Sequence, residues 1–161
     1  VWIGTAISFF FLYPATYNLL EIPAVARPEV KLYTSGIIRI SRHPQAIGQI
    51  IWCIAHFLWI GTSFMLLTCI GLIAHHLFAI WHGDRRLKER FGDVFEELRR
   101  QTSVVPFLAV LDGRQTLKLN EFLRPSQLGI AIAIGIFWWS HQFISFVNED
   151  LIFKYLPNLS A

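Results

Sequence analysis

The chain has 161 residues, of which 54% are hydrophobic and 15% aromatic, and its mean hydropathy is +0.47. This composition is more apolar than that of an ordinary soluble domain and, with the long uncharged runs described below, predicts an integral membrane protein. The net charge of +3 arises from 14 Lys and Arg against 11 acidic residues. Because the basic residues flank apolar runs, no nucleic-acid partner is expected. Cys53 and Cys69 both lie in apolar segments and indicate no disulfide framework.

Apolar segments along the chain predict an all-α fold, a polytopic bundle of membrane helices that forms a single domain over residues 1–161. A membrane-spanning helix needs about 20 apolar residues. The predicted spans cover residues 1–20, 44–60, 64–82 and 128–147. The chain begins at Val1 inside an apolar run, without an initiator Met or a charged flank. We therefore expect an N-terminally truncated fragment, with part of its active site before Val1.

The loops predict how the helices cross the membrane. The three residues from Gly61 to Ser63 join the second and third spans too briefly to be anything but a turn between antiparallel helices. Thirteen of the 14 Lys and Arg lie in residues 27–42 and 85–124, which predicts that both loops face the side of insertion. Apolar residues at helical spacing predict an amphipathic helix over residues 84–100, lying on the membrane surface.

The second span carries the first candidate site residues. Cys53 and His56 are three residues apart, so on a helix they share a face, and aromatic residues surround them. Imidazole and thiolate are both axial ligands of haem iron, whereas a closed zinc site needs about four such ligands. The alternative is that His56 hydrogen-bonds a neighbouring helix and Cys53 is a small buried hydrophobe. Spacing alone does not decide between these interpretations.

The third span adds the pair His75 and His76. Adjacent residues of a helix point about 100° apart, so only one of them can face a site at His56. The offset between that site and the pair is on the order of 10 Å along the helix axis. This separation suits opposite ends of a large cofactor better than joint ligation of one small metal ion.

Other candidates lie nearer the membrane boundary or in the last span. His43 precedes a proline at the boundary, where a solvated residue or a partner of lipid phosphate is expected, although Arg39, Arg42 and His43 together suit an anionic group. His82 is a similar boundary residue. His141 is a secondary candidate inside the last span.

Several ordered motifs make this sequence recognisable. They are Gly36–Gln45, Gln49–His56, Gly71–Phe78, Gly83–Leu87, Thr102–Phe107 and Leu111–Gln115. On these motifs the chain resembles the NnrU-like membrane proteins, and within them the plastid and cyanobacterial family of 15-cis-zeta-carotene isomerases. The resemblance is dense over residues 36–115, weak before it and nearly absent after residue 119.

The resemblance implies a membrane enzyme of the plastid (chloroplast) or of cyanobacteria that contains haem b. The implied reaction converts 9,15,9'-tri-cis-zeta-carotene into the 9,9'-di-cis isomer. His56 is the implied iron ligand and Cys53 the residue that replaces a His when the iron is reduced, while the other family His has no counterpart in residues 1–161. The implied partners are the carotenoid substrate, the lipid bilayer and neighbouring enzymes of carotenoid biosynthesis.

Two other functions stay open from the sequence. The Arg42-His43-Pro44 entry also resembles membrane isoprenylcysteine and phospholipid methyltransferases, which hold S-adenosylmethionine with a His-Pro region and a later pair of Glu. This chain has Asp84-Arg85 where that pair is expected, which counts against the chemistry. The remaining alternative is an NnrU-like haem-binding membrane protein without isomerase activity.

Overall fold

The computed structural model describes residues 1–17, 32, 34–122, 129 and 131–143. It divides into two compact units, Val1–Arg124 and Pro125–Ala161, which we treat separately. The described residues form helices and turns and no strand, which confirms the all-α class. In the second unit, residues 131–143 are helical and fall within the predicted span 128–147, whose ends lie outside the described residues. The single domain predicted from the sequence stays a prediction.

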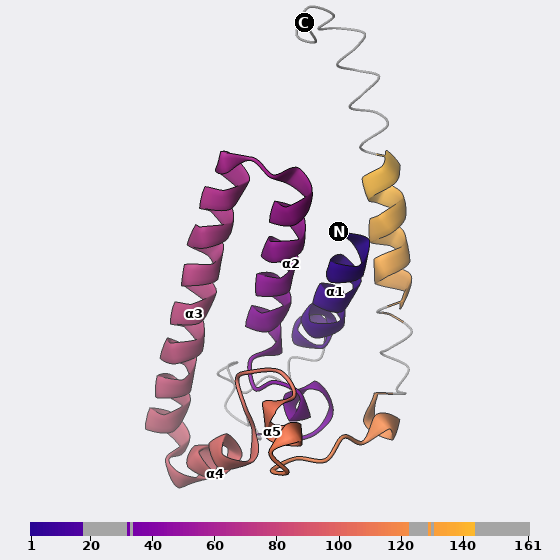
Figure 1. Cartoon of the computed structure of the whole chain (residues 1–161). Helices are drawn as coiled ribbons and strands as arrows, with labels where there is room; N and C mark the ends of the chain where they lie inside the picture. The colour runs from indigo at the N-terminus through magenta and orange to yellow at the C-terminus, as the bar shows by residue number, and fades with distance from the viewer. Residues whose placement is uncertain (18–31, 33, 123–128, 130, 144–161) are drawn as a thin grey trace, which may run out of the picture. The chain divides into compact units, whose positions relative to one another are not determined.

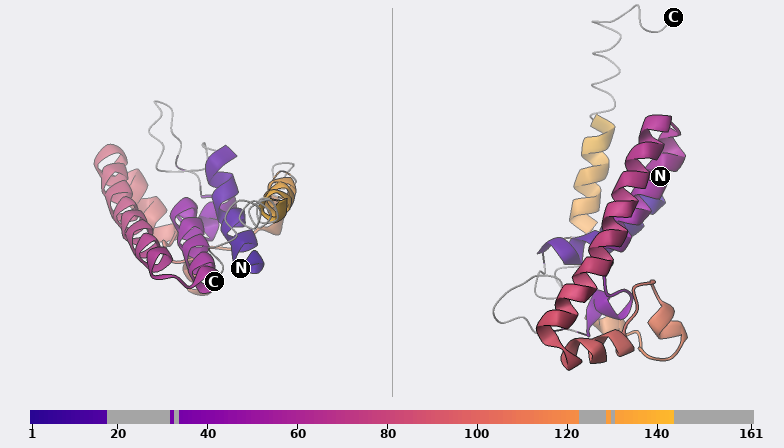
Figure 2. Two further views of the ribbon diagram at one scale, coloured as in Figure 1. Left: turned by 90° about the horizontal axis from the view of Figure 1, so that it is seen from above. Right: turned by 90° about the vertical axis from the view of Figure 1, so that its left-hand side faces the viewer.

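Three long helices form the upper part of the first unit in Figure 1. Helix α1 covers Trp2–Tyr17, α2 covers Pro44–Ile60 and α3 covers Ser63–Phe91. Helix α2 packs against both α1 and α3, and Figure 2 shows the α2–α3 pair from two further directions. The bounds of α2 coincide with the predicted span 44–60, since Pro44 occupies the first helical turn, where its missing N–H costs no hydrogen bond. Residues 18–20 of the first predicted span lie outside the described part.

The turn between α2 and α3 is built from two local caps. Gly61 adopts the left-handed conformation at φ 66°, and its N–H donates to the Phe57 carbonyl, which ends α2. Thr62 begins α3, because its side-chain oxygen accepts a hydrogen bond of 3.2 Å from the Met65 N–H. The predicted antiparallel hairpin is therefore present.

Small residues allow close contact between α1 and α2. A Cβ added at Gly4 would lie 2.7 Å from the Ala55 Cβ, and one at Gly48 would lie 2.9 Å from the Ser8 carbonyl oxygen. The buried Ser8 hydroxyl donates to the Gly48 carbonyl oxygen at 2.8 Å, so its polar group is satisfied. No larger side chain fits at these crossings without moving a helix backbone.

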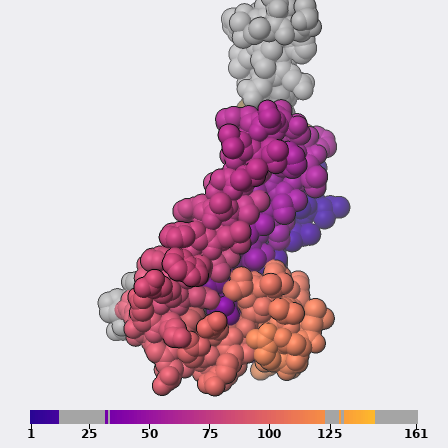
Figure 3. Space-filling view, turned by 60° about the vertical axis from the view of Figure 1, so that its left-hand side comes forward, coloured from indigo at the N-terminus to yellow at the C-terminus, as the bar shows by residue number. Residues whose placement is uncertain are grey.

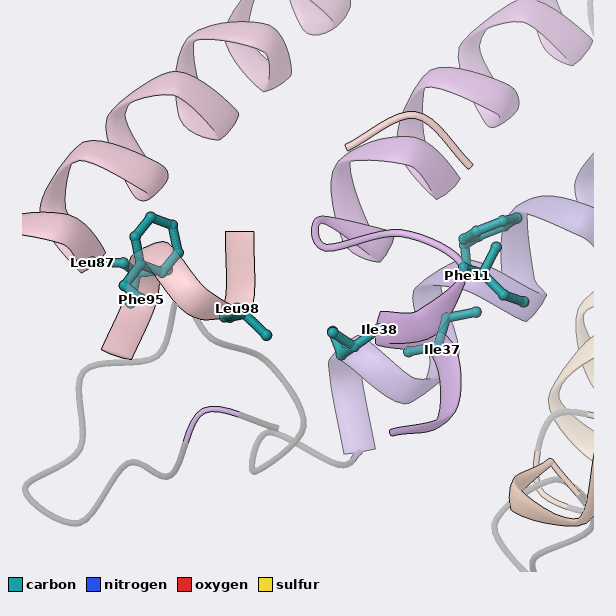
Figure 4. Packing of buried hydrophobic residues seen from close by; sticks show 7 residues of the cluster. Phe11, Ile37, Ile38, Leu87, Phe95 and Leu98 are labelled. Carbon is teal, nitrogen blue, oxygen red and sulfur yellow. The ribbon is translucent and has the colours of Figure 1, made fainter. Parts of the chain in front are cut away.

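A second layer of short helices lies at the end of α3 farthest from the turn (Figure 1). It contains η2 (Gly36–Arg39), α4 (Asp93–Gln101), α5 (Leu108–Leu111) and η3 (Leu119–Glu121). Its hydrophobic core also takes in one residue of α1 and one of α3, and Figure 4 shows most of its members. The core consists of Phe11, Ile37, Ile38, Ile40, Leu87, Phe95 and Leu98. This core joins α1, the segment around η2 and α4 to the lower end of α3.

The stretch predicted as one surface helix over residues 84–100 is divided in the structure. Helix α3 continues to Phe91, Gly92 breaks it with φ 51°, and α4 follows in a new direction. Its apolar residues Phe95 and Leu98 are buried in the protein core, so they are not available to a membrane surface. An amphipathic pattern shows that a helix has an apolar face, but it does not say what covers that face.

Among the described residues, α3 is the one helix long and apolar enough to cross a membrane by length and composition. The apolar parts of α1 and α2, Trp2–Leu12 and Pro44–Ile60, are shorter than this criterion requires. The number of membrane crossings therefore stays a prediction.

The α1–α2 contact predicts a large effect of one methyl group at Gly48. We expect Gly48→Ala to lower the free energy of unfolding by about 1–3 kcal/mol, because the added Cβ meets the Ser8 carbonyl and the Leu12 side chain. The matched control is Gly71→Ala in α3, where a Cβ meets no atom within 4 Å, and a gain of about 0.5–1 kcal/mol is expected. Chemical unfolding in detergent, followed by circular dichroism, measures both, and equal effects would contradict the proposed contact.

Candidate functional site

His56 lies in the second half of α2 with 8% of its surface exposed. Its Nδ1 is 2.9 Å from the backbone carbonyl oxygen of Trp52, one turn earlier. Because a carbonyl oxygen only accepts, Nδ1 carries the proton and Nε2 has the lone pair. Among the described residues, Nε2 has no hydrogen-bond partner. This is the tautomer that a histidine uses to bind a metal through Nε2 while its other nitrogen is held by a carbonyl.

Trp52 also covers one face of the His56 ring. The two rings are stacked, with centroids 3.9 Å apart and an angle of 24° between their planes. The sequence identified the aromatic surroundings of His56 without singling out this partner. The four-residue spacing could have identified it, since residues four apart are neighbours on a helix.

Cys53 is one turn before His56 and is fully buried between α2 and α3. It packs with Met65 and Cys69, and the Cys69 thiol donates to the Cys53 carbonyl oxygen at 3.2 Å. Both cysteines are free thiols. The hairpin thus places the chain's two thiols in one apolar cluster beside His56, a pairing across helices that the sequence did not predict.

His75 and His76 lie at the other end of the hairpin from His56. Their rings are 5.2 Å apart, His75 is exposed and His76 is half-buried. Both line a hollow of about 200 Å³ together with the start of α2, including His43 and Gln45. The structure therefore separates this pair from the Cys53–His56 turn, as the axial offset estimated from the sequence indicates.

Two further histidines, His82 and His141, are exposed in the structure. The His82 ring lies parallel to that of Phe78, with centroids 5.9 Å apart. His141 belongs to the second unit, where its ring lies 6.1 Å from that of Phe137. Neither joins a cluster of other candidate ligands among the described residues.

Asp84 holds the two basic residues that precede α2. The Arg42 guanidinium, which is 5% exposed, donates to both Asp84 oxygens at 3.1 and 2.7 Å, and His43 Nε2 lies 2.7 Å from Oδ1. The His43 side chain is 9% exposed, so the expectation of a solvated boundary histidine is wrong. Arg42 also donates through its backbone N–H to the Ser103 carbonyl at 2.7 Å. Arg42 and His43, which the sequence suggested as partners of an external anion, are thus already bound to an internal carboxylate.

Arg39 makes a similar internal pair with Glu121. Its guanidinium contacts both Glu121 oxygens at 2.8 and 2.9 Å and donates to the Gln115 side-chain oxygen at 2.7 Å. The Gly36 N–H also donates to Glu121, at 2.6 Å. Hydrogen bonding from Arg39 lowers the pKa of Glu121 to about 2. These bonds tie η2 to η3 across more than 80 residues of sequence.

The donor set of the described residues suits a haem better than a bare metal ion. No group of three or more His, Cys, Asp and Glu is placed to hold a metal ion within the described part of the chain. A porphyrin supplies its own equatorial nitrogens, so one axial imidazole is sufficient to anchor it. His56 meets that requirement with a fixed Nδ1–H and a free Nε2 in an apolar surrounding. Between α1 and α2 lies an apolar hollow of about 340 Å³, lined in part by Gly4, Ala55 and Trp59 and not by His56.

Comparison with known proteins identifies the family. The sequence pattern described as "NnrU protein" matches residues 1–149. The chain belongs to the NnrU family. This confirms the resemblance drawn from its motifs, which in this NnrU protein include the Arg42-His43-Pro44 and Cys53-to-His56 segments.

Two curated relatives of this NnrU protein are about half identical to it. The chain is 50% identical over 142 residues to a protein named "15-cis-zeta-carotene isomerase, chloroplastic" from Arabidopsis thaliana, an alignment that covers 86% of this chain and 39% of the relative. It is 52% identical over 154 residues to a Zea mays protein of the same name, covering 94% of this chain and 42% of the relative. The chain thus spans about two fifths of the length of these relatives. No solved structure matches it significantly.

The Arg39–Glu121 pair predicts a loss of stability in acid. Because the folded pKa of Glu121 is about 2 and the reference value is 4.5, this pair stabilises the fold fully above pH 4.5 and progressively less as the pH falls towards 2. We expect Glu121→Gln to be less stable than the wild type at pH 7 and to lose less stability between pH 4.5 and 2. Melting temperatures across this range measure the difference. Parallel curves for the two proteins would contradict it.

Proposed function

We propose that this protein is a 15-cis-zeta-carotene isomerase of plastid membranes. The observation that supports this most strongly is the identity of about 50% over most of the chain to two chloroplastic relatives of that name. The proposed substrate is 9,15,9'-tri-cis-zeta-carotene and the product its 9,9'-di-cis isomer. Such a substrate is a hydrocarbon, which an apolar helical protein can hold without a polar binding site.

The proposal includes a polytopic arrangement in the membrane. Helix α3 supports it, because only 11% of the residues in its most apolar 18-residue stretch are buried among the described residues, and many of its large apolar side chains are exposed. Figure 3 shows the outer face of α3 as an open surface, and Phe64, Leu67 and Ile70 are 78%, 70% and 56% exposed. An apolar helix that the rest of the protein leaves exposed needs an apolar environment, which a bilayer provides. The basic loops on one side of the hairpin give the proposed orientation.

We propose that His56 would hold haem b through Nε2, with Cys53 as a second ligand candidate. The free Nε2 of His56 and the nearness of both residues on one turn support this assignment. When bound, the haem iron would supply transient electron donation or Lewis acidity, which weakens double-bond character without acid, base or net oxidation. The chain orients His56 through Trp52 and keeps water from Cys53 by packing it against α3. His75 and His76, at their separate hollow, are proposed as further cofactor-binding residues.

The apolar hollow between α1 and α2 is the proposed contact for the hydrocarbon. Ala55 and Trp59 line it on α2, one and three residues from His56, which is not itself among the residues that line it. Its other walls, Ile51, Ile54 and Leu58, are aliphatic. Carotenoid-pathway enzymes acting on this substrate or its product are the proposed neighbours in the membrane.

The methyltransferase alternative is weakened by the structure. Asp84 stands where such enzymes hold S-adenosylmethionine, but here it accepts hydrogen bonds from Arg42 and His43. The non-catalytic haem-binding alternative requires an activity measurement. In darkness, bacteria that accumulate the tri-cis carotene should convert it when they express the protein. An unchanged isomer profile beside a normal haem spectrum would leave the binding role alone.

The ligand assignment predicts different effects of two histidine variants. His56→Ala should abolish isomerisation and lower haem content by at least tenfold, because it removes the nitrogen proposed to bind iron. His82→Ala, an exposed residue outside the site, is the matched control and should retain both. Haem absorbance of purified protein and the carotenoid profile by chromatography measure the outcome. Normal haem content in His56→Ala would overturn the assignment.

The thiols provide a parallel test. Cys53→Ala should change the absorbance spectrum of the reduced haem, whereas Cys69→Ala should leave it unchanged and only loosen packing. Both changes remove one buried thiol from the same cluster, so their packing costs are comparable. Identical reduced spectra for Cys53→Ala and wild type would remove Cys53 from the list of ligands.

The proposed topology predicts one-sided labelling. In a background without native cysteines, Thr62→Cys in the hairpin turn and Leu111→Cys near α5 should react with an impermeant maleimide from opposite sides of sealed vesicles. The turn and the basic loops lie at opposite ends of the hairpin, which is the physical basis of the expectation. Labelling of both positions from the same side would contradict a membrane-crossing hairpin.

A further inference from the structure

Residues 105–108 form a turn with exposed apolar side chains that none of the proposed sites uses. Val105, Phe107 and Leu108 are 56%, 43% and 42% exposed. The Leu108 N–H donates to the Val105 carbonyl at 3.3 Å, so the three residues belong to one turn, which we call the 105–108 turn. Single exposed apolar residues are ordinary on a protein surface, but a contiguous group of large ones is typical of a contact site.

Hydrogen bonds hold this turn beside the entrance of α2. The Arg42 N–H donates to the Ser103 carbonyl at 2.7 Å, the Ser41 hydroxyl to the Val104 carbonyl at 2.8 Å, and the Phe107 N–H to the Ile40 carbonyl at 2.9 Å. Residues 40–42 lead directly into α2, which begins at Pro44 (Figure 1). The turn is therefore fixed at the level where α2 enters the proposed membrane.

The backbone of Phe107 has a conformation that an aromatic residue adopts only with strain. Among the described residues, it is the one residue other than glycine with a positive φ, at 63°. Its carbonyl accepts the N–H groups of Val110 and Leu111 and so starts α5, a task that glycine or asparagine performs at less cost in this conformation. Strain of this kind occurs most often at functional sites. The ring of Phe107 is therefore the part that indicates a contact.

We propose that the 105–108 turn is a membrane anchor, which inserts Val105, Phe107 and Leu108 into the interfacial layer of the bilayer beside the entrance of α2. Lipid is the partner, because the turn is hydrogen-bonded to the residues that lead into a helix proposed to cross the bilayer. The turn also lies within residues 85–124, one of the two basic loops, which suits the phosphate groups at that depth.

The anchor replaces the surface helix that the sequence predicts over residues 84–100. Phe95 and Leu98 of that stretch are buried in the protein core, so they cannot enter lipid. The 105–108 turn follows shortly after them in the chain and supplies exposed apolar side chains on the same side of the hairpin. The proposal rests on the proposed membrane-crossing hairpin, and not on haem binding or isomerisation.

The first test measures the depth of the turn in lipid. Leu108→Cys, in a background without native cysteines, carries an environment-sensitive fluorophore, and the protein is placed in nanodiscs of phosphatidylcholine and phosphatidylglycerol. Interfacial segments bury their apolar side chains by about 5–10 Å, so a nitroxide near the top of the lipid acyl chain should quench this label more than one near the chain end.

The matched control for depth is Val94→Cys on α4, an apolar residue that is 64% exposed. Its label should be quenched several-fold less, because α4 lies beyond the end of α3. Equal quenching at the two positions overturns the proposal. A label at Leu108 that is shielded from water but not quenched by lipid nitroxides also overturns it, since a protein partner would then cover the turn.

The second test removes the ring of Phe107 and keeps its backbone conformation. Phe107→Gly and Phe107→Asn both suit a φ of 63°, so the melting temperature in detergent should change little. The label at Leu108 should lose most of its quenching by lipid in both variants, whereas Phe107→Trp should keep it. If Phe107→Gly does not fold, Phe107→Asn decides the question. Unchanged quenching in a folded variant without the ring overturns the anchor.

Failure of the anchor can be told apart from failure of the proposed function. Neither the carotenoid profile nor the haem spectrum enters these measurements. If the hairpin turn and α5 label from opposite sides of the vesicle but the Leu108 label is not quenched, the anchor fails and the proposed topology stands. If both positions label from the same side while the Leu108 label is quenched, the membrane-crossing hairpin fails and the turn still contacts lipid.

Discussion

The ion cluster around Asp84 fixes the geometry on which the rest of the first unit depends. Asp84 lies just beyond the apolar part of α3, and Arg42 and His43 immediately precede α2, so their hydrogen bonds hold one end of the hairpin together. Gly61 and Thr62 close the other end. With both ends fixed, α2 cannot slide along α3, because a shift would separate a buried guanidinium from its carboxylate, at a cost of about 3–5 kcal/mol.

This fixed register decides what faces Cys53. The Cys69 thiol meets the Cys53 carbonyl, and Met65 fills the space next to both. On the α1 side, Gly4 and Gly48 let the helix backbones approach closely. Helix α2 is therefore held on two sides by different means, small residues against α1 and larger apolar side chains against α3. His56 lies between these two contacts, with its ring nitrogen left for a partner.

The charged side chains around the layer of short helices pair with one another instead of forming a binding surface. Arg39 is bound by Glu121 and Gln115, Arg42 by Asp84, and the exposed basic residues of α4 pair with neighbouring acids. Buried charge is costly unless it is paired, so these partners are a condition of burial. Some of the basic residues in these loops thus form internal ion pairs. The basic residues that stay exposed are available to contact the membrane on the side proposed for these loops.

The sequence by itself determined the helical class, the bounds of α2, the hairpin turn and the family. These follow from local rules: apolar periodicity, Pro44 in a first turn, a link of only three residues at Gly61–Ser63, and ordered motifs at fixed spacing. It also placed Cys53 and His56 on one helix turn, since three-residue spacing is a property of any helix.

Only the tertiary structure decided what packs against the apolar face of each helix. Residues 84–100 belong to two helices, and Phe95 and Leu98 of the second helix pack into the protein core instead of lying on a membrane surface. The tertiary structure also brings Cys69 to Cys53, 16 positions away in the sequence. Asp84 likewise meets Arg42 and His43, about 40 positions away. Pairings of this kind depend on how two helices are aligned, and helical periodicity within either one carries no information about that alignment.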